Sequence, residues 1–361
     1  MTKYEWKQEE ILENIKNTTK QETLLKEIND QRDDVLHKMY DRECTPKEFR
    51  RSFRNDFIKL AKIDEDMLTY TIRLHEMEDV GNIYKYGFFE NGMTTDELVT
   101  IVHDFYHSLG DKDIAKEVDI ILNPDNHFLR IEQGHTKEIN SILQGRAIKD
   151  ENSNLTYGSY YRRNNIQDIP TLTHEVGHML SHRLFQQDAN PITQLFLSEL
   201  ESQYMELLSI QYIANNLKDP KMALCLQMNR LNYIFDQAWD VFAQYLLFES
   251  HGFSTGLADK LKEAGYTLKV NDETIKLFQK MPLLKKAKII NSFMAALELY
   301  RITQEDQQKG IKLYKKIFTS KETEYKKFLD KHKINYIKDT STLECMLDKA
   351  RQLKKIVSDY N

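Results

Sequence analysis

The stretch TLTHEVGHMLSHRLFQQDANPITQLFLSELESQYME, from Thr171 to Glu206, carries the clearest information on fold and function in this chain. It contains His174-Glu175-Val176-Gly177-His178, an H-E-x-x-H pattern. On a helix, two histidines four residues apart project from one face and can share a metal ion. The glutamate between them lies about 100° round the helix, within reach of a water molecule on that metal. The pattern therefore predicts a helix that carries a metal site.

A third metal ligand is expected on the helix that follows. A catalytic zinc ion takes three protein ligands and keeps one position open. Asn190-Pro191 is a typical helix start, with Asn as the N-cap and Pro as the first helical residue. Four polar residues of this helix lie on one face: Glu199, Ser202, Gln203 and Glu206. Because Glu206 lies about 10 Å further along the axis than Glu199, the two cannot bind one ion. We expect Glu199 as the ligand.

The other polar residues of that face are expected to support the site. Glu206, Ser202 and Gln203 would orient His174, His178 or the backbone. Glu201 lies about 200° from Glu199, on the other side of the helix. Glu175 would then act as the general base toward a metal-activated water. The alternative interpretation is an ordinary solvated helix face.

Two further residues of the metal helix have a less specific meaning. Gly177 costs about 1 kcal/mol relative to Ala inside a helix, which indicates the close approach of another backbone, with a nearby sheet as the candidate. His182 lies two turns after His174 on nearly the same face. It could contact a substrate, although a structural polar contact is the favoured interpretation.

Composition excludes several classes of protein. The 361 residues are 40% hydrophobic and 30% charged, with a net charge of −5, so a globular chain without a nucleic-acid partner is predicted. Three cysteines far apart in sequence indicate reduced thiols. Without an apolar leader or a run of about 18 apolar residues, we expect a cytoplasmic protein with no membrane partner. Export by a signal-less route would leave the same sequence.

The chain contains only 6 prolines and 12 glycines, which favours long helices. Apolar residues at three- and four-residue spacing predict helices from Pro46 to about Leu74, from Thr94 to Gly110, from Pro220 to about His251 and from Ile289 to Tyr300. Short β-branched or aromatic runs predict a small sheet between Val118 and Tyr161, and these are VDIIL, HFLRIEQ and LTYGSYY.

The last of these runs contains the candidate substrate strand. An edge strand beside a metal can pair with an extended peptide through main-chain hydrogen bonds. Gly158 and Tyr160, within Gly158-Ser159-Tyr160-Tyr161, are the residues that we expect to contact substrate there. A structural hairpin is the alternative.

A second pair of histidines, His103 and His107, also stands four residues apart on a predicted helix. The residue after His103 is Asp104 rather than Glu, and no third ligand is near in sequence. Ordinary surface histidines, or histidines that support another site, are therefore the favoured interpretation, and metal binding is the alternative.

The motif residues resemble those of the thimet oligopeptidase and oligoendopeptidase F metallopeptidases. The resemblance is carried by Thr171 to His178 and by the segment Glu199-Leu200-Glu201-Ser202-Gln203-Tyr204-Met205-Glu206. It implies a mostly helical zinc peptidase with a channel-like cleft that admits unstructured peptides. It also implies the ligands His174, His178 and Glu199. Glu175 would be the base.

The chain departs from that family in two places. The family has a further histidine one turn after the second ligand, where this chain has Ser181. The family also has a C-terminal segment, rich in His and Tyr, that polarises the substrate carbonyl. The best counterpart runs from Asn291 to Tyr300 and lacks the histidine, so Tyr300 is the candidate oxyanion donor. A core aromatic is the alternative for Tyr300.

Together these features predict a mostly α, helical zincin-type metallopeptidase with a small β-sheet next to the metal helix. We expect a single catalytic domain over 1–361, with a helical N-terminal part (1–115), a small sheet (116–165) and a part with the metal helices and C-terminal helices (166–361). One Zn²⁺ per chain and a peptide substrate are predicted. The alternatives are a catalytically weakened member that binds peptides or proteins, and a zinc hydrolase acting on a non-peptide amide.

Overall fold

A computed structural model of the chain contains two compact units, and most of the residues that it describes lie in one of them. The chain divides into two compact units, Met1–Asn17, Ile83–Leu231 and Ser292–Asn361 in the first, and Thr18–Asn82 and Asn232–Asn291 in the second. Most described residues belong to the first unit. The described residues are 92–133, 145–149, 156–184, 191–219, 222–227, 229–230, 233–234, 237, 283–319, 322 and 324–334, with the single residues 3, 30 and 259.

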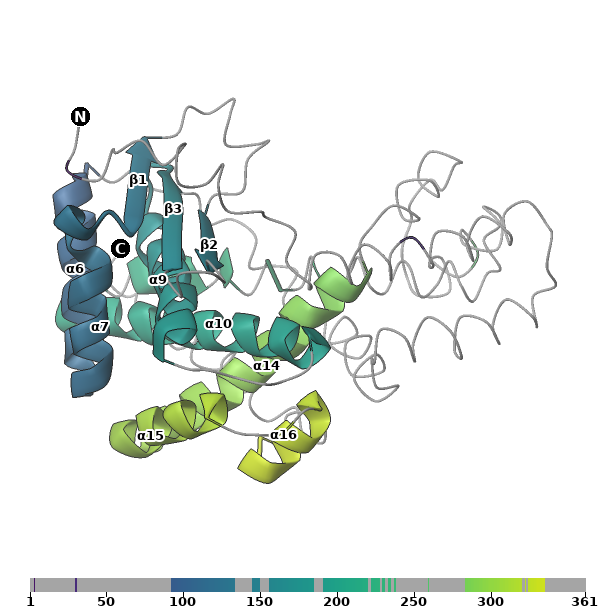
Figure 1. The fold of residues 1–361 in the computed structure, drawn as a ribbon. Helices are drawn as coiled ribbons and strands as arrows, with labels where there is room; N and C mark the ends of the chain where they lie inside the picture. The colour runs from purple at the N-terminus through teal and green to yellow at the C-terminus, as the bar shows by residue number, and fades with distance from the viewer. Residues whose placement is uncertain are drawn as a thin grey trace. The chain divides into compact units, whose positions relative to one another are not determined.

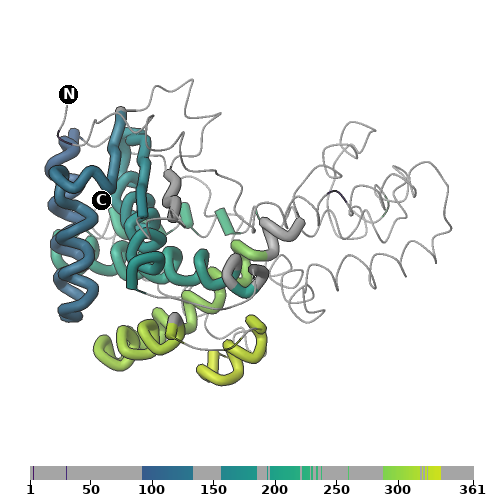
Figure 2. The backbone as a smooth tube through the Cα atoms, in the orientation of Figure 1, coloured from purple at the N-terminus to yellow at the C-terminus, as the bar shows by residue number. Residues whose placement is uncertain are grey.

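The first two described helices, α6 (Thr95–Ser108) and α7 (Lys112–Leu122), run side by side (Figures 1 and 2). Thr94 and Glu97 form a capping box at the start of α6, and Gly110 follows its end in a left-handed conformation (φ 73°). The helix predicted from Thr94 to Gly110 is thereby confirmed.

The run VDIIL, which we predicted as a strand, is instead the second half of α7. Asp111 caps this helix by accepting hydrogen bonds from the Asp113 and Ile114 backbone amides. The buried residues follow helical spacing, and they are Ile114, Val118, Ile121 and Leu122. The five-residue window hides this period because Ile114 lies outside it.

Three strands form the described sheet, in the order β1 (Leu129–Gln133), β3 (Thr156–Arg162) and β2 (Gly145–Lys149). β3 pairs with β1 in parallel and with β2 antiparallel. The strands predicted in HFLRIEQ and LTYGSYY are therefore present. β3 is the central strand, however, so the expectation that Gly158 and Tyr160 lie on an edge strand is wrong: both sides of β3 are already paired.

The metal helix α9 (Asp168–Leu184) begins at a buried polar cluster that ties it to the sheet. Tyr160 donates a hydrogen bond to Asp168 Oδ1 at 2.6 Å, and the Arg163 amide donates to the same oxygen at 2.9 Å. The Arg162 guanidinium Nε lies 3.8 Å from Asp168 Oδ2 and its Nη1 donates to Thr95 on α6. Because buried polar groups are costly unless paired, this cluster fixes where α9 starts.

The second metal helix, α10 (Pro191–Asn216), packs against α9 at very short range. A Cβ atom on Gly177 would lie 3.2 Å from Ser202 Cα. The glycine therefore permits a close approach of another backbone, as its position in the sequence indicates. The partner is α10 rather than the sheet.

Three C-terminal helices complete the described part of the chain: α14 (Leu283–Glu305), α15 (Gln307–Phe318) and α16 (Tyr325–His332). Ser292 of α14 donates a hydrogen bond to the Phe196 carbonyl of α10 at 2.7 Å. Phe196 in turn stacks on Tyr325 of α16, with ring centroids 4.6 Å apart. The helix predicted from Ile289 to Tyr300 lies within α14 and is confirmed.

The fold class is confirmed as mostly helical, with a small sheet whose strands β2 and β3 lie against α9 (Figure 1). None of the described helices has the length and apolar character needed to cross a bilayer. The helix predicted from Pro46 to Leu74 lies outside the described residues, as does most of the one from Pro220. The single-domain assignment and its boundaries stay predictions.

Candidate metal centre

Two imidazoles and a carboxylate converge between α9 and α10. One ligand atom each of His174, His178 and Glu199 lies within 4.8 Å of the other two. His174 Nε2 is 3.9 Å from Glu199 Oε2, and the two imidazole rings meet edge to face with centroids 4.7 Å apart. All three side chains are partly buried. Two nitrogen donors and one oxygen donor from two rigid helices make a set that suits zinc and leaves a further coordination position.

The other ring nitrogen of His174 faces a carboxylate. His174 Nδ1 lies 3.3 Å from Glu206 Oε2, and the same oxygen lies 3.1 Å from the Arg230 guanidinium. Glu206 therefore joins the metal helix to a cation from a later segment of the chain. A carboxylate at Nδ1 fixes the ring orientation and favours the tautomer whose Nε2 lone pair can bind metal.

His178 has a matching carboxylate on its outer side. His178 Nδ1 lies 3.5 Å from Glu201 Oε1, and Glu201 is only 1% exposed. Burial raises the pKa of Glu201 well above its ordinary value, and the charge of Glu199 raises it further, although the Ser181 hydroxyl lowers it. A cation beside His178 would favour the ionised carboxylate, so the arrangement is suited to a positive charge at this site.

The electrostatics of His174 point the same way. Burial alone would lower the pKa of His174, but the hydrogen bond to Glu206 and the charges of Glu206, Glu175 and Glu199 outweigh it and raise this pKa. Three carboxylates around one imidazole thus favour a positive charge there. A divalent cation satisfies that preference more fully than a proton does.

Glu175, the glutamate inside the H-E-x-x-H pattern, is buried, with 7% of its surface exposed. Burial raises its pKa to about 7; the charges of Glu199 and Glu206 add to the increase, and the charge of His174 opposes it. A carboxyl group with a pKa near neutrality can accept and release a proton under ordinary conditions.

Comparisons with known proteins agree with this architecture. No protein-family model matches the chain, and no curated protein matches its sequence. A solved structure described as an oligoendopeptidase F superposes on 91% of this chain with a TM-score of 0.63 at 12% identity. PZ peptidase A with an inhibitor superposes on 83% with a TM-score of 0.60 at 11% identity, and a protein described as a peptidase from Chlamydophila abortus on 92% with 0.63 at 13%.

The chain has the oligoendopeptidase F fold. The resemblance seen in the sequence is thereby confirmed for the fold. The chain covers 65%, 61% and 63% of these three neighbours, so it spans less than two thirds of their length. Since a fold does not determine an activity, any function of this chain has to be argued from the side chains that it places on the oligoendopeptidase F fold.

Ser202, one of the residues expected to support the histidines, makes other contacts within this fold. Ser202 donates to the Ser198 and Glu199 carbonyls of its own helix at 3.2 and 3.1 Å. Its position opposite Gly177 indicates that a small residue is needed there. Gln203 is fully buried on α10, and its role stays a prediction. His182 lies half-buried in the last turn of α9.

Gly158 and Tyr160, the predicted substrate residues, face the metal helix instead. A Cβ atom on Gly158 would lie 2.5 Å from Met179 Sδ, so the absent side chain makes room for α9. Tyr160 is 1% exposed and donates its hydroxyl hydrogen to Asp168. Both residues position α9 on the sheet, and the side chain of Tyr160 is not accessible to a substrate.

Tyr300, the candidate oxyanion donor, does not join the group of metal ligands. Its hydroxyl donates to Gln211 Oε1 at 2.9 Å. Gln211 is twelve residues beyond Glu199 on α10, which corresponds to about 18 Å along the helix axis. The structure therefore separates the Tyr300 hydroxyl from Glu199 by a little under half of the length of this helix.

Sequence reasoning missed two residues of the centre. The helical angle from Glu199 predicts Glu201 on the other side of α10, yet the close contact at Gly177 lets both flanks of α10 reach α9. Arg230 belongs to a segment 24 residues after Glu206, and no local pattern links the two. The one available signal is that the buried acidic residues of α10 need a cation.

Proposed function

We propose that this chain is a zinc-dependent endopeptidase or oligopeptidase that binds one Zn²⁺ through His174, His178 and Glu199. The observation that carries the proposal is the convergence of these three donors beside the buried Glu175. The peptidase neighbours of the same fold support the class of reaction.

The donor set fits zinc on grounds of its own chemistry. Each histidine meets a carboxylate at Nδ1, Glu206 for His174 and Glu201 for His178, so Nε2 is the nitrogen left for the ion. A zinc ion bound there would supply a Lewis acid that polarises the scissile carbonyl and activates water.

Glu175 is the residue that we assign to proton transfer. Its carboxylate accepts a proton from the attacking water and then delivers it to the amine that leaves when the peptide bond breaks. Burial raises the proton affinity of Glu175, because it disfavours the charged carboxylate, and this favours the uptake of the proton from water. Glu206 and Glu201 hold the imidazoles and take no part in the proton transfer.

The edge of β2 is the proposed place for the peptide main chain. Among the described strands β2 lies at an edge of the sheet, pairs antiparallel with β3 and packs on α9. An extended substrate that added to this edge would lie beside the metal helix, with its backbone held by hydrogen bonds that do not depend on its side chains.

Cleavage of a quenched fluorescent peptide library by the zinc-loaded chain tests the proposal. Glu175→Gln should abolish cleavage and keep zinc, because Gln has nearly the same shape and cannot accept the proton. His174→Ala should lose the zinc at this site. Zinc retained in full by His174→Ala would overturn the assignment of the centre.

Other results would redirect the proposal toward the alternatives. A wild-type chain that holds zinc and binds peptides without cutting them would indicate a peptide-binding protein. Cleavage of non-peptide amides alone would indicate the other hydrolase class. Tyr300→Phe should leave kcat within about twofold, because the Tyr300 hydroxyl is remote from the metal ligands. The loss of a true oxyanion donor typically lowers kcat by about 100-fold or more. A loss of that size would restore Tyr300 as the donor.

A further inference from the structure

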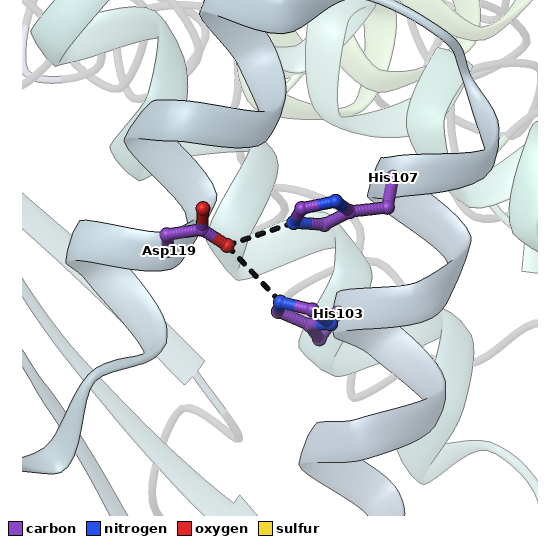
Figure 3. A group of neighbouring side chains, drawn as sticks. All are labelled: His103, His107 and Asp119. Atoms are coloured by element: carbon purple, nitrogen blue, oxygen red, sulfur yellow. Dashed lines mark hydrogen bonds and ion pairs between the residues drawn. The ribbon is translucent and has the colours of Figure 1, made fainter.

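A second group of side chains that could hold a metal ion lies on α6 and α7 and shares no residue with the proposed active site. His103 and His107 stand one turn apart on α6, and Asp119 faces them from α7 (Figure 3). His103 Nε2 lies 3.0 Å and His107 Nε2 2.7 Å from the same oxygen, Asp119 Oδ1. The three donor atoms thus lie within 4.8 Å of one another.

The positions of these side chains are set by buried packing behind them. Each helix presents a buried apolar face, which includes Val102 and Phe105 on α6 and Val118 and Ile121 on α7. The short connection at Gly110 and the Asp111 N-cap fix how the two helices follow one another. The histidine pair and Asp119 therefore meet because of the helix packing, even though their side chains are exposed.

A second carboxylate orients one of the two imidazoles. His103 Nδ1 lies 3.2 Å from Asp104 Oδ1, while its Nε2 points at Asp119. This is the arrangement in which an outer carboxylate holds Nδ1–H and directs the Nε2 lone pair toward a metal. Asp104, which follows His103 where an H-E-x-x-H pattern would have glutamate, thus orients the His103 ring.

The donor set selects a class of ion. Two imidazole nitrogens and one carboxylate oxygen suit zinc and the neighbouring divalent transition ions, whereas Ca²⁺ and Mg²⁺ prefer oxygen ligands alone. The side chains of His103, His107 and Asp119 are 38%, 39% and 52% exposed, so water can complete the coordination and the ion can exchange.

We propose that His103, His107 and Asp119 form a second, solvent-open binding site for Zn²⁺ or a similar divalent transition ion, which bridges α6 and α7. The site shares no residue with the proposed active centre. The competing interpretation is a purely electrostatic contact, in which Asp119 pairs with the histidines and no metal is bound.

Equilibrium dialysis against buffered Zn²⁺ tests this directly. The wild-type chain should bind two zinc ions, one for each group of ligands. His107→Asn should lose one of them, and the matched control His127→Asn should lose none. His127 is exposed and has a positive φ of 53°, a conformation that Asn tolerates well. Asp104→Asn should weaken the second site by about tenfold or more through the loss of its orienting carboxylate.

The His174→Ala variant isolates the second site. In this background Zn²⁺ should raise the midpoint of thermal unfolding, because an ion that binds only the native state stabilises it. His174→Ala/His107→Asn should show no such rise. Equal zinc binding by wild type and His107→Asn would overturn the second site. An equal zinc-induced thermal shift in His174→Ala and in His174→Ala/His107→Asn would overturn it as well. Loss of zinc in His107→Asn together with full retention in His174→Ala would instead overturn only the proposed active centre.

Discussion

Gly177 and Ser202 bring the two metal helices into backbone contact, since a Cβ atom on Gly177 would lie 3.2 Å from Ser202 Cα. Gly177 directly precedes the ligand His178 on α9, and Ser202 lies three residues after the ligand Glu199 on α10. A small residue on each helix thus sets the distance between the metal ligands. The close contact explains why a glycine that costs helix stability occurs inside the H-E-x-x-H pattern.

Gly177→Ala should therefore weaken zinc binding more than it weakens the fold. The added methyl group would lie 3.2 Å from the Ser202 Cα atom, so the helices must move apart by a few tenths of an ångström. We expect a cost of about 1–3 kcal/mol for overpacking, while Ala returns about 1 kcal/mol of helix propensity. We expect zinc affinity to fall by about tenfold or more. Zinc titration and urea denaturation measure the two effects. Gly92→Ala is the control, because a Cβ there meets nothing within 4 Å. An unchanged zinc affinity in Gly177→Ala would contradict this account.

Glu201→Gln should reduce zinc affinity by about 10- to 100-fold, the range found when an outer carboxylate of a metal-binding histidine is removed. The reason is that Glu201 is the carboxylate 3.5 Å from His178 Nδ1. Competition with a fluorescent chelator measures the affinity. Glu305→Gln, an exposed glutamate paired with Arg301, serves as the matched control. Equal affinities in Glu201→Gln and wild type would rule out the orienting role.

Arg230 and Glu206 form a nearly buried ion pair, with side chains 11% and 8% exposed. Removing one partner of such a pair leaves an uncompensated charge, so Arg230→Met should lower the free energy of unfolding by about 3 kcal/mol. The double variant Arg230→Met/Glu206→Gln should lose less than the sum of the two single variants. Urea denaturation of the metal-free proteins gives the coupling energy. Strict additivity would show that the pair does not interact.

How far the fold could be predicted differs from element to element. The start of α6 follows from local chemistry, because Thr94 and Glu97 form their capping box within one turn. The strand predicted in VDIIL is wrong because five apolar-rich residues fit either period, and only Ile114 and Asp111, outside that run, make α7 recognisable as a helix. The strand β2, GRAIK, has one β-branched residue, Ile148, and no aromatic, whereas β3 contains three tyrosines.

In the candidate site, too, some residues could be predicted from the sequence and others could not. The convergence of His174, His178 and Glu199 could be anticipated because their spacing within two helices fixes which face each residue occupies. Glu201 and Asp119 could not, since their partners are determined by how one helix crosses or follows another. Tertiary packing, rather than spacing, decides which polar residues reach a histidine.

A test of stability against pH concerns Lys315 on α15, which binds the N-cap of α7. Its Nζ donates to Asp111 Oδ2 at 3.0 Å and to Asp113 Oδ2 at 2.5 Å. Burial alone would raise the pKa of Asp111, but the hydrogen bonds from the Ile114 amide and from Lys315 lower it below its usual 3.8. Burial alone would lower the pKa of Lys315, but the same carboxylates raise it above 10.5.

The contribution of this contact should consequently be constant between about pH 5 and pH 10 and disappear at either extreme. A depressed carboxyl pKa means that the stabilisation is lost as pH falls below about 4, and a raised lysine pKa means that it is lost as pH rises above about 10.5. At pH 7, Lys315→Met should lower the free energy of unfolding by about 0.5–1 kcal/mol, because both partners remain partly exposed. Urea denaturation at pH 7 and pH 3 measures the difference, with the exposed neighbour Lys316→Met as control. A deficit that is as large at pH 3 as at pH 7 would assign the effect to lost packing of the lysine side chain instead of to its charge.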